Sequence, residues 1–331
     1  MKMCKRCINT TNNPSITIDE EGICNVCRDY ETKFDEKKLD EELEFLKTFI
    51  NENDEINSLS ALSGGKDSSA MLYSVKEMGF KPLAFTFEIG YNILTDSLKN
   101  KINKICENIG VEHEYIDAYP YVTDIDKQCF KLTAEMYDKP VDENTKEEFK
   151  KVYHEGRKHY STKDQTIMPF VRPCQICRKI AIKAYYEEAL KHNVRIVFVG
   201  INEWTGLSNN TYTAIRELKP FPDRPSVYIV HLPFLIHRKL GDLNEILEKI
   251  GWERETGDNK VDTGGSACML ARIAESKSTD MLGFNIDEAR LSREVTAGFL
   301  DKDSALSAVN NYKKEVNESM TEVLERSGLL C

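Results

Sequence analysis

The six residues Ser63-Gly64-Gly65-Lys66-Asp67-Ser68 carry the most informative chemistry in this sequence. Two glycines allow consecutive backbone N–H groups to face an anion, and the start of a helix behind them would add partial positive charge. Lys66 can place a full charge on a phosphate, and the two serines can donate their hydroxyls. Asp67 can hold Mg²⁺ or an amide at the loop. The segment is therefore predicted to bind nucleotide phosphates, with a chance hexapeptide as the alternative.

Four of the ten cysteines lie near the N-terminus in two pairs, Cys4/Cys7 and Cys24/Cys27. Each Cys-x-x-Cys turn can present two thiolates, and sixteen residues between the pairs is the spacing of a zinc ribbon. A site with four cysteines is coordinatively closed, so a structural zinc ion is predicted. Iron or a redox pair is the alternative.

A second cysteine set consists of Cys174, Cys177 and the distant Cys268. Three thiolates are one short of a closed zinc tetrahedron. They can hold a [4Fe-4S] cluster by three irons and leave the fourth iron for sulfide, or they can pass persulfide sulfur directly. A helix start and flanking arginines are expected to stabilise thiolates at Cys174 and Cys177. The alternatives are a second structural metal site and an unrelated buried Cys268.

Regular elements must position these groups. Apolar runs typical of strands lie at 56–62, 83–87, 113–116 and 194–200, with helical patterns between them at 69–78, 97–109 and 176–191. This alternation predicts an α/β fold with a parallel sheet and crossover helices, and the phosphate loop at the carboxyl end of its first strand. A fifth apolar run covers 227–236. The charged, weakly patterned stretch 140–166 is typical of an insertion or a lid.

A further polar segment follows the strand predicted at 194–200. Gly200, Asn202 and Glu203 should emerge at the same sheet edge as the phosphate loop, so Gly200 and Asn202 are predicted to bind nucleotide. Trp204 can stack on a ring or pack in the interior. An ordinary turn at the end of a strand is the alternative for this segment.

Composition is that of a protein with more than one module. The 331 residues include 40% hydrophobic and 30% charged side chains, enough to bury a substantial core. A net charge of -10 weighs against a broad nucleic-acid-binding face. Without a membrane-length apolar segment or an apolar signal region at its start, the chain is expected to be cytoplasmic.

Four segments are predicted along the chain. Residues 1–35 would form the zinc ribbon and 36–54 a helical connector. Residues 55–240 would form the nucleotide domain, and 241–331 a helical C-terminal region that completes the active site.

Two families share these motifs. The loop resembles the SGGKDS signature of the PP-loop (N-type) ATP pyrophosphatases, which implies a Rossmann-like fold, splitting of ATP between the α and β phosphates, and adenylation of an acceptor oxygen. The head around Cys4-Lys5-Arg6-Cys7 and the segment Leu291-Ser292-Arg293-Glu294-Val295 resemble N-acetyl sugar amidotransferases of this superfamily. The Cys174/Cys177 pair after Arg172-Pro173 is instead similar to iron-sulfur-dependent tRNA thiolation enzymes, and their further C-terminal zinc ribbon is absent.

The resemblance implies an ATP-dependent sulfurtransferase that uses Mg²⁺, in which Lys66 and Asp67 act on ATP while Cys174, Cys177 and Cys268 deliver sulfur. A small-molecule or sugar acceptor is favoured over tRNA, with a sulfide or persulfide carrier as donor and a second copy of the chain as a further partner. One alternative is an N-acetyl sugar amidotransferase fed with ammonia by a glutaminase subunit. The other is a non-catalytic zinc-ribbon adaptor that binds nucleotide.

Overall fold

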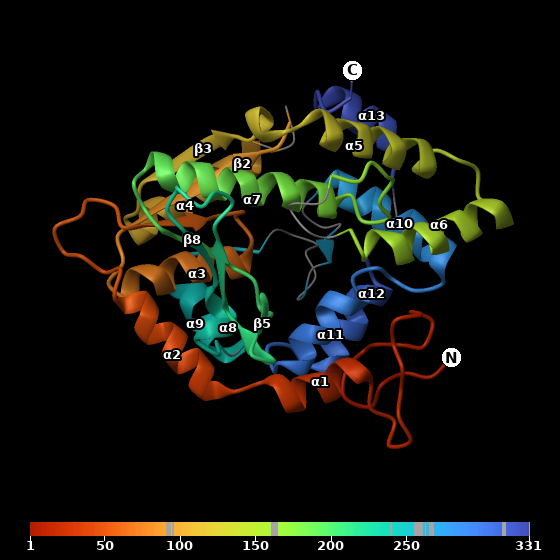
Figure 1. Ribbon diagram of the computed structural model, residues 1–331, viewed down its shortest axis with the longest axis horizontal. Helices are drawn as coiled ribbons and strands as arrows, with labels where there is room; N and C mark the ends of the chain where they lie inside the picture. Colours follow the sequence, from red (N-terminus) through yellow and green to blue (C-terminus); the bar gives the residue numbers. More distant parts are fainter. Residues whose placement is uncertain are drawn as a thin grey trace.

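The protein is described by a computed structural model (Figure 1). The described residues are 1–90, 94, 96–159, 165–238, 240–254, 261, 263–264, 268–312 and 316–330. A central sheet and its helices occupy one side of the molecule. The N-terminal segment lies beside the C-terminal helices on the other side (Figure 1).

The central sheet has six strands in the order β3-β2-β1-β4-β8-β7. Their bounds are β1 Ser58–Ala61, β2 Pro82–Glu88, β3 His113–Asp117, β4 Ile196–Val199, β7 Ile215–Leu218 and β8 Val227–His231. All neighbours pair in parallel except β7, which runs antiparallel to β8 at one edge. The prediction of an α/β fold built on a parallel sheet is confirmed.

Helices cover both faces of this sheet. One face carries α2 (Glu36–Lys47), α3 (Lys66–Glu77), α4 (Asp96–Ile109), α8 (Leu232–Leu235) and α9 (Leu240–Lys249). The other face is covered by α7 (Cys174–Lys191), whose Ile182, Tyr186 and Ala189 pack on β1, β2, β4 and β8. Burial of both faces explains why the central strands β4 and β8 are almost continuously apolar, whereas β3, at the edge of the sheet, buries only Ile116.

A second layer of helices extends from the start of α7. Helices α5 (Asp124–Tyr137), α6 (Glu143–Gly156), α10 (Met269–Leu282) and α13 (Met320–Arg326) share one apolar core with it. Helices α11 (Glu288–Thr296) and α12 (Lys302–Asn310) pack on each other and close a smaller core against the N-terminal segment, which includes α1 (Asn25–Lys33). None of the described helices has the length and apolarity to cross a membrane.

Two local expectations differ from the structure, and one further element was not predicted. The interpretation of 140–166 as a lid is wrong for Glu143–Gly156, because α6 buries Phe149 and Val152 against the core shared with α10. The apolar run 227–236 is a strand only to His231, after which it turns into α8. A small hairpin, β5 (Gly206–Ser208) with β6 (Thr211–Thr213), follows β4.

Candidate active site and metal centre

The phosphate loop lies between the end of β1 and the start of α3. Gly65 caps α3 with extended backbone, and Gly64 has a positive φ of 73°, which favours glycine. The Ser63 backbone N–H donates to Ser68 Oγ at 3.1 Å, and the two serine hydroxyls lie 3.0 Å apart. The indole N–H of Trp252 donates to the Gly64 carbonyl at 3.0 Å. The loop is therefore held from both sides, and its free backbone donors stand at the positive end of a twelve-residue helix.

Asp67 joins three elements at the loop. Its Oδ1 accepts hydrogen bonds from Asn202 Nδ2 and from the Arg238 guanidinium, each at 3.1 Å, and Lys66 Nζ lies 3.9 Å from Oδ2. Arg238 also donates to Asn202 Oδ1 at 3.2 Å, and its side chain is only 3% exposed. The amide partner predicted for Asp67 is thus Asn202, and the charge of Arg238 offsets the carboxylate.

The end of β4 meets the loop directly. A Cβ added to Gly200 would lie 2.7 Å from the Cα and the N of Ser68, so backbone contacts backbone here. Glu203 pairs with Arg293 of α11, and its backbone carbonyl accepts from His231 Nδ1 at 2.7 Å. Trp204 packs away from this contact, stacked on Tyr212 at 4.2 Å between ring centroids.

Helix α11 faces the loop and the end of β4. Besides the Arg293–Glu203 pair, Arg290 binds Glu294 at 2.6 Å and Asp287 at 3.1 Å. Burial raises the pKa of Glu294, and the positive charge of Arg290 lowers it in part. Among the loop residues, the negative charge of Asp67 raises this pKa further and the positive charge of Lys66 lowers it. We call the group formed by the Ser63–Ser68 loop, the end of β4 and the polar side of α11 the central site.

The central site continues to the cysteine pair through Asp287. This carboxylate accepts from Arg172 at 2.9 Å, from Arg290 at 3.1 Å and from the Gly264 N–H at 2.6 Å. Burial would raise its pKa, but the charges of Arg290 and Arg172 outweigh burial and lower the pKa to about 2. Asp287 therefore ties together the residue before Pro173, the segment that leads to Cys268, and α11.

The three cysteines of the second set lie at two helix starts. Cys174 and Cys177 are in the first turn of α7, and Cys268 is the N-cap residue of α10. Their thiols are close enough to interact electrostatically, because Cys174 and Cys268 both act on the pKa of Cys177. Within the described part of the chain they do not form a set whose ligand atoms all lie within 4.8 Å. The arrangement is thus wider than a mononuclear metal site.

The expected stabilisation of thiolates at Cys174 and Cys177 does not hold. Burial raises the pKa of Cys174 to about 12, with a further contribution from Cys268, and it raises the pKa of Cys177 strongly. Arg172 lowers the pKa of Cys174 by less, and its guanidinium is paired with Asp287. The residue Cys174 as a whole is exposed to solvent, so the increase in its pKa comes from the protein atoms around its thiol and is weakened by the solvent contact, whereas Cys177 is half-buried. Both cysteines would be neutral thiols at pH 7 without a bound cation or cluster.

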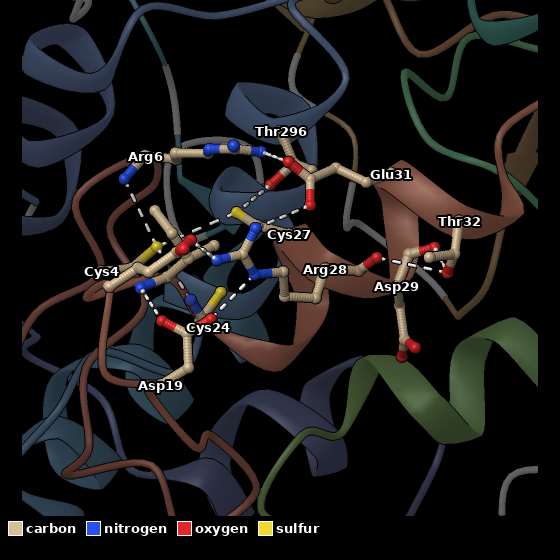
Figure 2. Close-up of polar contacts among 12 residues, drawn as sticks. Cys4, Arg6, Asp19, Cys24, Cys27, Arg28, Asp29, Glu31, Thr32 and Thr296 are labelled. Carbon is tan, nitrogen blue, oxygen red and sulfur yellow. Dashed lines mark hydrogen bonds and ion pairs between the residues drawn. The ribbon is translucent and has the colours of Figure 1, made fainter.

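The N-terminal cysteines form a separate, closed group (Figure 2). Cys4, Cys7, Cys24 and Cys27 are buried, and their sulfurs all lie within 4.8 Å of one another. Cys4 Sγ lies 3.9 Å from Cys27 Sγ, and Cys7 Sγ lies 3.6 Å from Cys24 Sγ. A zinc tetrahedron with bonds of about 2.3 Å needs sulfurs roughly 3.8 Å apart. The donor set therefore fits a tetrahedral metal site.

Hydrogen bonds to the sulfurs support the same conclusion. The backbone N–H groups of Arg6 and Cys24 donate to Cys4 Sγ at 3.4 and 3.3 Å, and the Asn9 amide donates to Cys24 Sγ at 3.6 Å. Such donors orient cysteine sulfurs and offset negative charge on a metal centre. Hydrogen bonding to Cys24, with burial, raises the pKa of Cys27 to about 12, so a cation is needed to hold it as thiolate.

Several residues of the central site carried no assigned role in the sequence. They are Arg238, Asp287, Arg290, Arg293 and Glu294. Arg293 and Glu294 stand in a segment that resembles the amidotransferases, which was the one available signal for α11. Arg238, which follows α8, contacts Asp67 in the phosphate loop, and Asp287, at the start of α11, contacts Arg172 near the cysteines. Both residues are distant in sequence from the groups they contact, so no local motif predicts their roles.

Comparison with known proteins locates one family. Residues 57–161 match the family model of the queuosine biosynthesis protein QueC. The 7-cyano-7-deazaguanine synthase of Methanocaldococcus jannaschii is 26% identical over 203 residues, covering 56% of this chain and 80% of that protein. An uncharacterised protein of the same archaeon is 22% identical over 98% of this chain and 99% of its own length.

Two solved structures show a weak likeness. The U34-tRNA thiolase NcsA from Methanococcus maripaludis with its [4Fe-4S] cluster is 12% identical with a TM-score of 0.36, covering 96% of this chain and 91% of that one. NMN synthetase from Francisella tularensis is 14% identical with a TM-score of 0.33, covering 86% of this chain and 98% of that one.

Proposed function

We propose that the protein is an ATP-dependent sulfurtransferase of the PP-loop ATP pyrophosphatase type, since residues 57–161, which match the QueC family model, contain the phosphate loop. The observation that carries the proposal is a series of interacting charges that runs from the phosphate loop to Arg172, two residues before Cys174. The charges of Asp67 and Lys66 influence the pKa of Glu294, and Glu294 forms an ion pair with Arg290. Arg290 and Arg172 both form ion pairs with Asp287. A nucleotide site and a thiol site thus share one group of charges.

The loop supplies the chemistry of the first step. Its backbone N–H groups and Lys66 would bind the β and γ phosphates, with Ser63 and Ser68 as further donors. Asp67, held by Arg238 and Asn202, is the residue placed to hold Mg²⁺. An acceptor carbonyl or amide oxygen attacks the α phosphorus, the bond to the β-phosphate oxygen breaks, and pyrophosphate leaves with Mg²⁺.

The second step replaces oxygen by sulfur. Hydrosulfide adds to the adenylated carbon, the carbon–oxygen bond breaks, and the products are the thiocarbonyl, AMP and a proton. A [4Fe-4S] cluster bound by Cys174, Cys177 and Cys268 would supply an iron that carries the sulfide. Persulfide carried on one of these cysteines is the other sulfur source: its terminal sulfur would add to the carbon and displace AMP, and a second cysteine thiol would then break the S–S bond, leaving the thiocarbonyl product and a disulfide between the two cysteines. Because the pKa values of Cys174 and Cys177 are raised, the charge of their thiolates would have to be offset by the cluster itself.

The acceptor is proposed to be a small molecule or a sugar. The net charge of -10 and the charge pairing within the central site favour a compact acceptor over a large RNA. Zinc is proposed for the N-terminal cysteine group on its sulfur spacing. The proposed partners are a sulfide or persulfide carrier and a second copy of the chain.

Ammonia is the alternative nucleophile, because the relative from Methanocaldococcus jannaschii is named for a product with a cyano group. In that case a glutaminase partner would supply the nitrogen. The adenylation step would be unchanged, and the three cysteines would hold a structural metal.

Anaerobic purification followed by visible spectroscopy and by iron and sulfide analysis distinguishes sulfur transfer from amidation with ammonia. The sulfurtransferase predicts a brown protein with thiolate-to-iron absorption. Cys268→Ala should lose the iron and sulfur transfer while keeping ATP binding, because Cys268 is outside the phosphate loop. Cys106→Ala is the control, since Cys106 is buried in the core under α4.

A colourless wild-type protein that forms AMP and a nitrogen-containing product from ammonia would replace sulfur transfer by amidation. Iron retained in full by Cys268→Ala would remove this cysteine from the cluster site.

A further inference from the structure

Helix α11 lies between the N-terminal cysteine group and the central site, and its two sides contact different parts of the molecule (Figure 1). Arg290, Arg293 and Glu294 recur at the helical spacing of three and four residues and form the polar contacts with the central site. Val295 packs against the four cysteines, and Thr296 contacts one of them. One short helix therefore touches both sites.

The contact of Thr296 is with a proposed metal ligand. Its Oγ1 lies 3.2 Å from Cys27 Sγ, and Figure 2 shows this contact joining the C-terminal end of α11 to the cysteine group. Cys27 is 1% exposed, so water does not replace the hydroxyl easily. The same hydroxyl donates to the Ser292 backbone carbonyl at 2.7 Å, so in the metal-free state the Cys27 thiol is the donor to Thr296 Oγ1. A metal-bound cysteine sulfur carries no proton, so with metal bound the Thr296 hydroxyl would turn its one proton from the Ser292 carbonyl to this sulfur as an outer-shell hydrogen bond.

The N-terminal segment also holds the region around α11 elsewhere. At the start of the helix Thr10 Oγ1 donates to Glu288 Oε2 at 3.4 Å. Beyond its end Lys302 of α12 donates to the Cys4 carbonyl at 2.8 Å, and Asn12 donates to the carbonyl of Gly283 at 2.9 Å. The helix is thus contacted at both ends by a segment that one metal ion would hold together.

We propose that Thr296 is a positioning residue through which the N-terminal metal site fixes α11 against the central site. With metal bound, the Cys27–Thr296 contact would keep Arg293 on Glu203 and Arg290 on Asp287, and the nucleotide loop would face an ordered α11. Without it, α11 would lose an anchor and nucleotide affinity would fall. The last consequence rests on the proposed function, since it requires that the loop binds ATP.

The test uses the full chain with metal bound and compares Thr296→Val with Thr296→Ser. Valine keeps the shape but removes the hydroxyl, whereas serine keeps the hydroxyl. Thr32→Val is the matched control, because Thr32 is exposed on α1 and bonds only the carbonyls of Arg28 and Asp29. Three quantities are measured: the rate of zinc transfer to a chromophoric chelator, amide hydrogen exchange over 288–296, and the dissociation constant of ATP.

For Thr296→Val we expect zinc transfer at least about 10-fold faster, faster exchange across α11 and weaker ATP binding. Thr296→Ser should restore all three, and Thr32→Val should match the wild type. The inference would be overturned if amide hydrogen exchange across α11 in Thr296→Val were as slow as in the wild type. It would also be overturned if Thr296→Ser showed the same changes as Thr296→Val. Faster exchange in Thr296→Val together with a wild-type protein that binds no ATP would support the role of Thr296 and contradict the proposed function instead.

Discussion

Two carboxylates hold the central site together. Asp67 accepts from Arg238 and Asn202 at the loop, and Asp287 accepts from Arg172, Arg290 and the Gly264 N–H near the cysteines. Each is surrounded by cationic or N–H donors, most of which come from elements distant in sequence; Arg290, three residues after Asp287, is the local one. Such charge-assisted hydrogen bonds are stronger than neutral ones and fix the groups that make them. The geometry of both ends of the site therefore depends on single acidic residues.

A substitution of Lys66 tests whether the phosphate loop acts on a nucleotide. Its side chain is 13% exposed, and it is the cation of the phosphate loop. Lys66→Ala should lower the rate of pyrophosphate release at least about 100-fold, because the charge that stabilises the leaving pyrophosphate is gone. Unfolding by urea should be unchanged. Lys47→Ala, an exposed change on α2, serves as control, and unaltered pyrophosphate release in Lys66→Ala would remove the assigned role.

The buried carboxyl group of Glu288 makes the free energy of unfolding depend on pH. Burial raises the pKa of Glu288 to about 7, above the value of about 4.3 in an unfolded chain. The folded state thus binds the proton more tightly, so this contribution is fully present below pH 4 and is lost as the pH rises to 7. Glu288→Gln should gain stability relative to the wild type by roughly 3 kcal/mol between pH 4 and pH 8.

Urea unfolding at several pH values measures this difference, with the exposed Glu20→Gln as control. A difference between wild type and Glu288→Gln that stays constant with pH would contradict the raised pKa.

Residue types and spacing predicted part of the site. The glycines and the lysine of the loop, and the paired cysteines near the N-terminus, lie within short segments whose chemistry is local. Arg238 and Asp287 could not be predicted, since their roles come from contacts across 171 and 115 positions of the chain. The raised pKa of Cys174 was also missed. Spacing shows the helix start and the arginine, but it does not show the protein atoms that surround the thiol.

The packing of β4 against the start of α3 is the closest approach between elements in the site. Gly200 allows it, because any Cβ there would lie 2.7 Å from Ser68 backbone atoms that cannot move as a side chain can. Gly200→Ala should therefore displace the loop and weaken ATP binding at least about 10-fold, with a smaller loss in stability. Calorimetric titration with ATP measures the effect.

Gly241→Ala in α9 is the control for this change. No heavy atom lies within 4 Å of its added methyl group, and alanine favours a helix. Equal ATP affinity in the Gly200→Ala and wild-type proteins would show that the contact does not position the loop.

Elements with strong apolar patterns were predicted and others were not. The strands β2, β4 and β8 are largely buried and contain long apolar runs. Helix α6 has charged residues over most of its surface and buries only one narrow side, so its stretch resembled a lid. The edge strand β7 has few buried side chains, and its pairing with β8 is set by tertiary contact. A periodic apolar pattern appears in a sequence only where many side chains of an element are buried. Because α6 and β7 bury few side chains, their sequences show only a weak pattern.

At the scale of the whole molecule, the N-terminal segment and the C-terminal helices depend on each other. Ile8 shares a core with Leu291 and Leu300, and Lys302 contacts the chain at Cys4 and Lys5. The proposed metal would therefore stabilise more than its own ribbon. The four predicted segments remain a prediction, and the contacts between the first and the last of them could not be inferred because no sequence pattern reports contacts between distant segments.

Cys4→Ser tests this dependence. Loss of one of four ligands should lower zinc binding and destabilise α11 and α12 together with the N-terminal segment. We expect a lower unfolding temperature and zinc content reduced from one equivalent, measured by calorimetry and atomic absorption. Cys129→Ser is the control, because Cys129 lies in the core around α5. Unchanged zinc content and unfolding temperature in Cys4→Ser would exclude the cysteine group as a metal site.

The contact between Cys27 and Thr296 joins residues that are 269 positions apart. A ribosome makes the cysteine group and the phosphate loop early, whereas α11 is made only after the whole sheet. Domains fold as they emerge, at about 5–20 residues per second. The partners of the phosphate loop, Asn202, Arg238 and Trp252, are themselves made late, and α11 follows them by only a few seconds at this rate. The contacts of α11 with the cysteine group on one side and with Glu203 on the other would therefore be among the last to form on a growing chain.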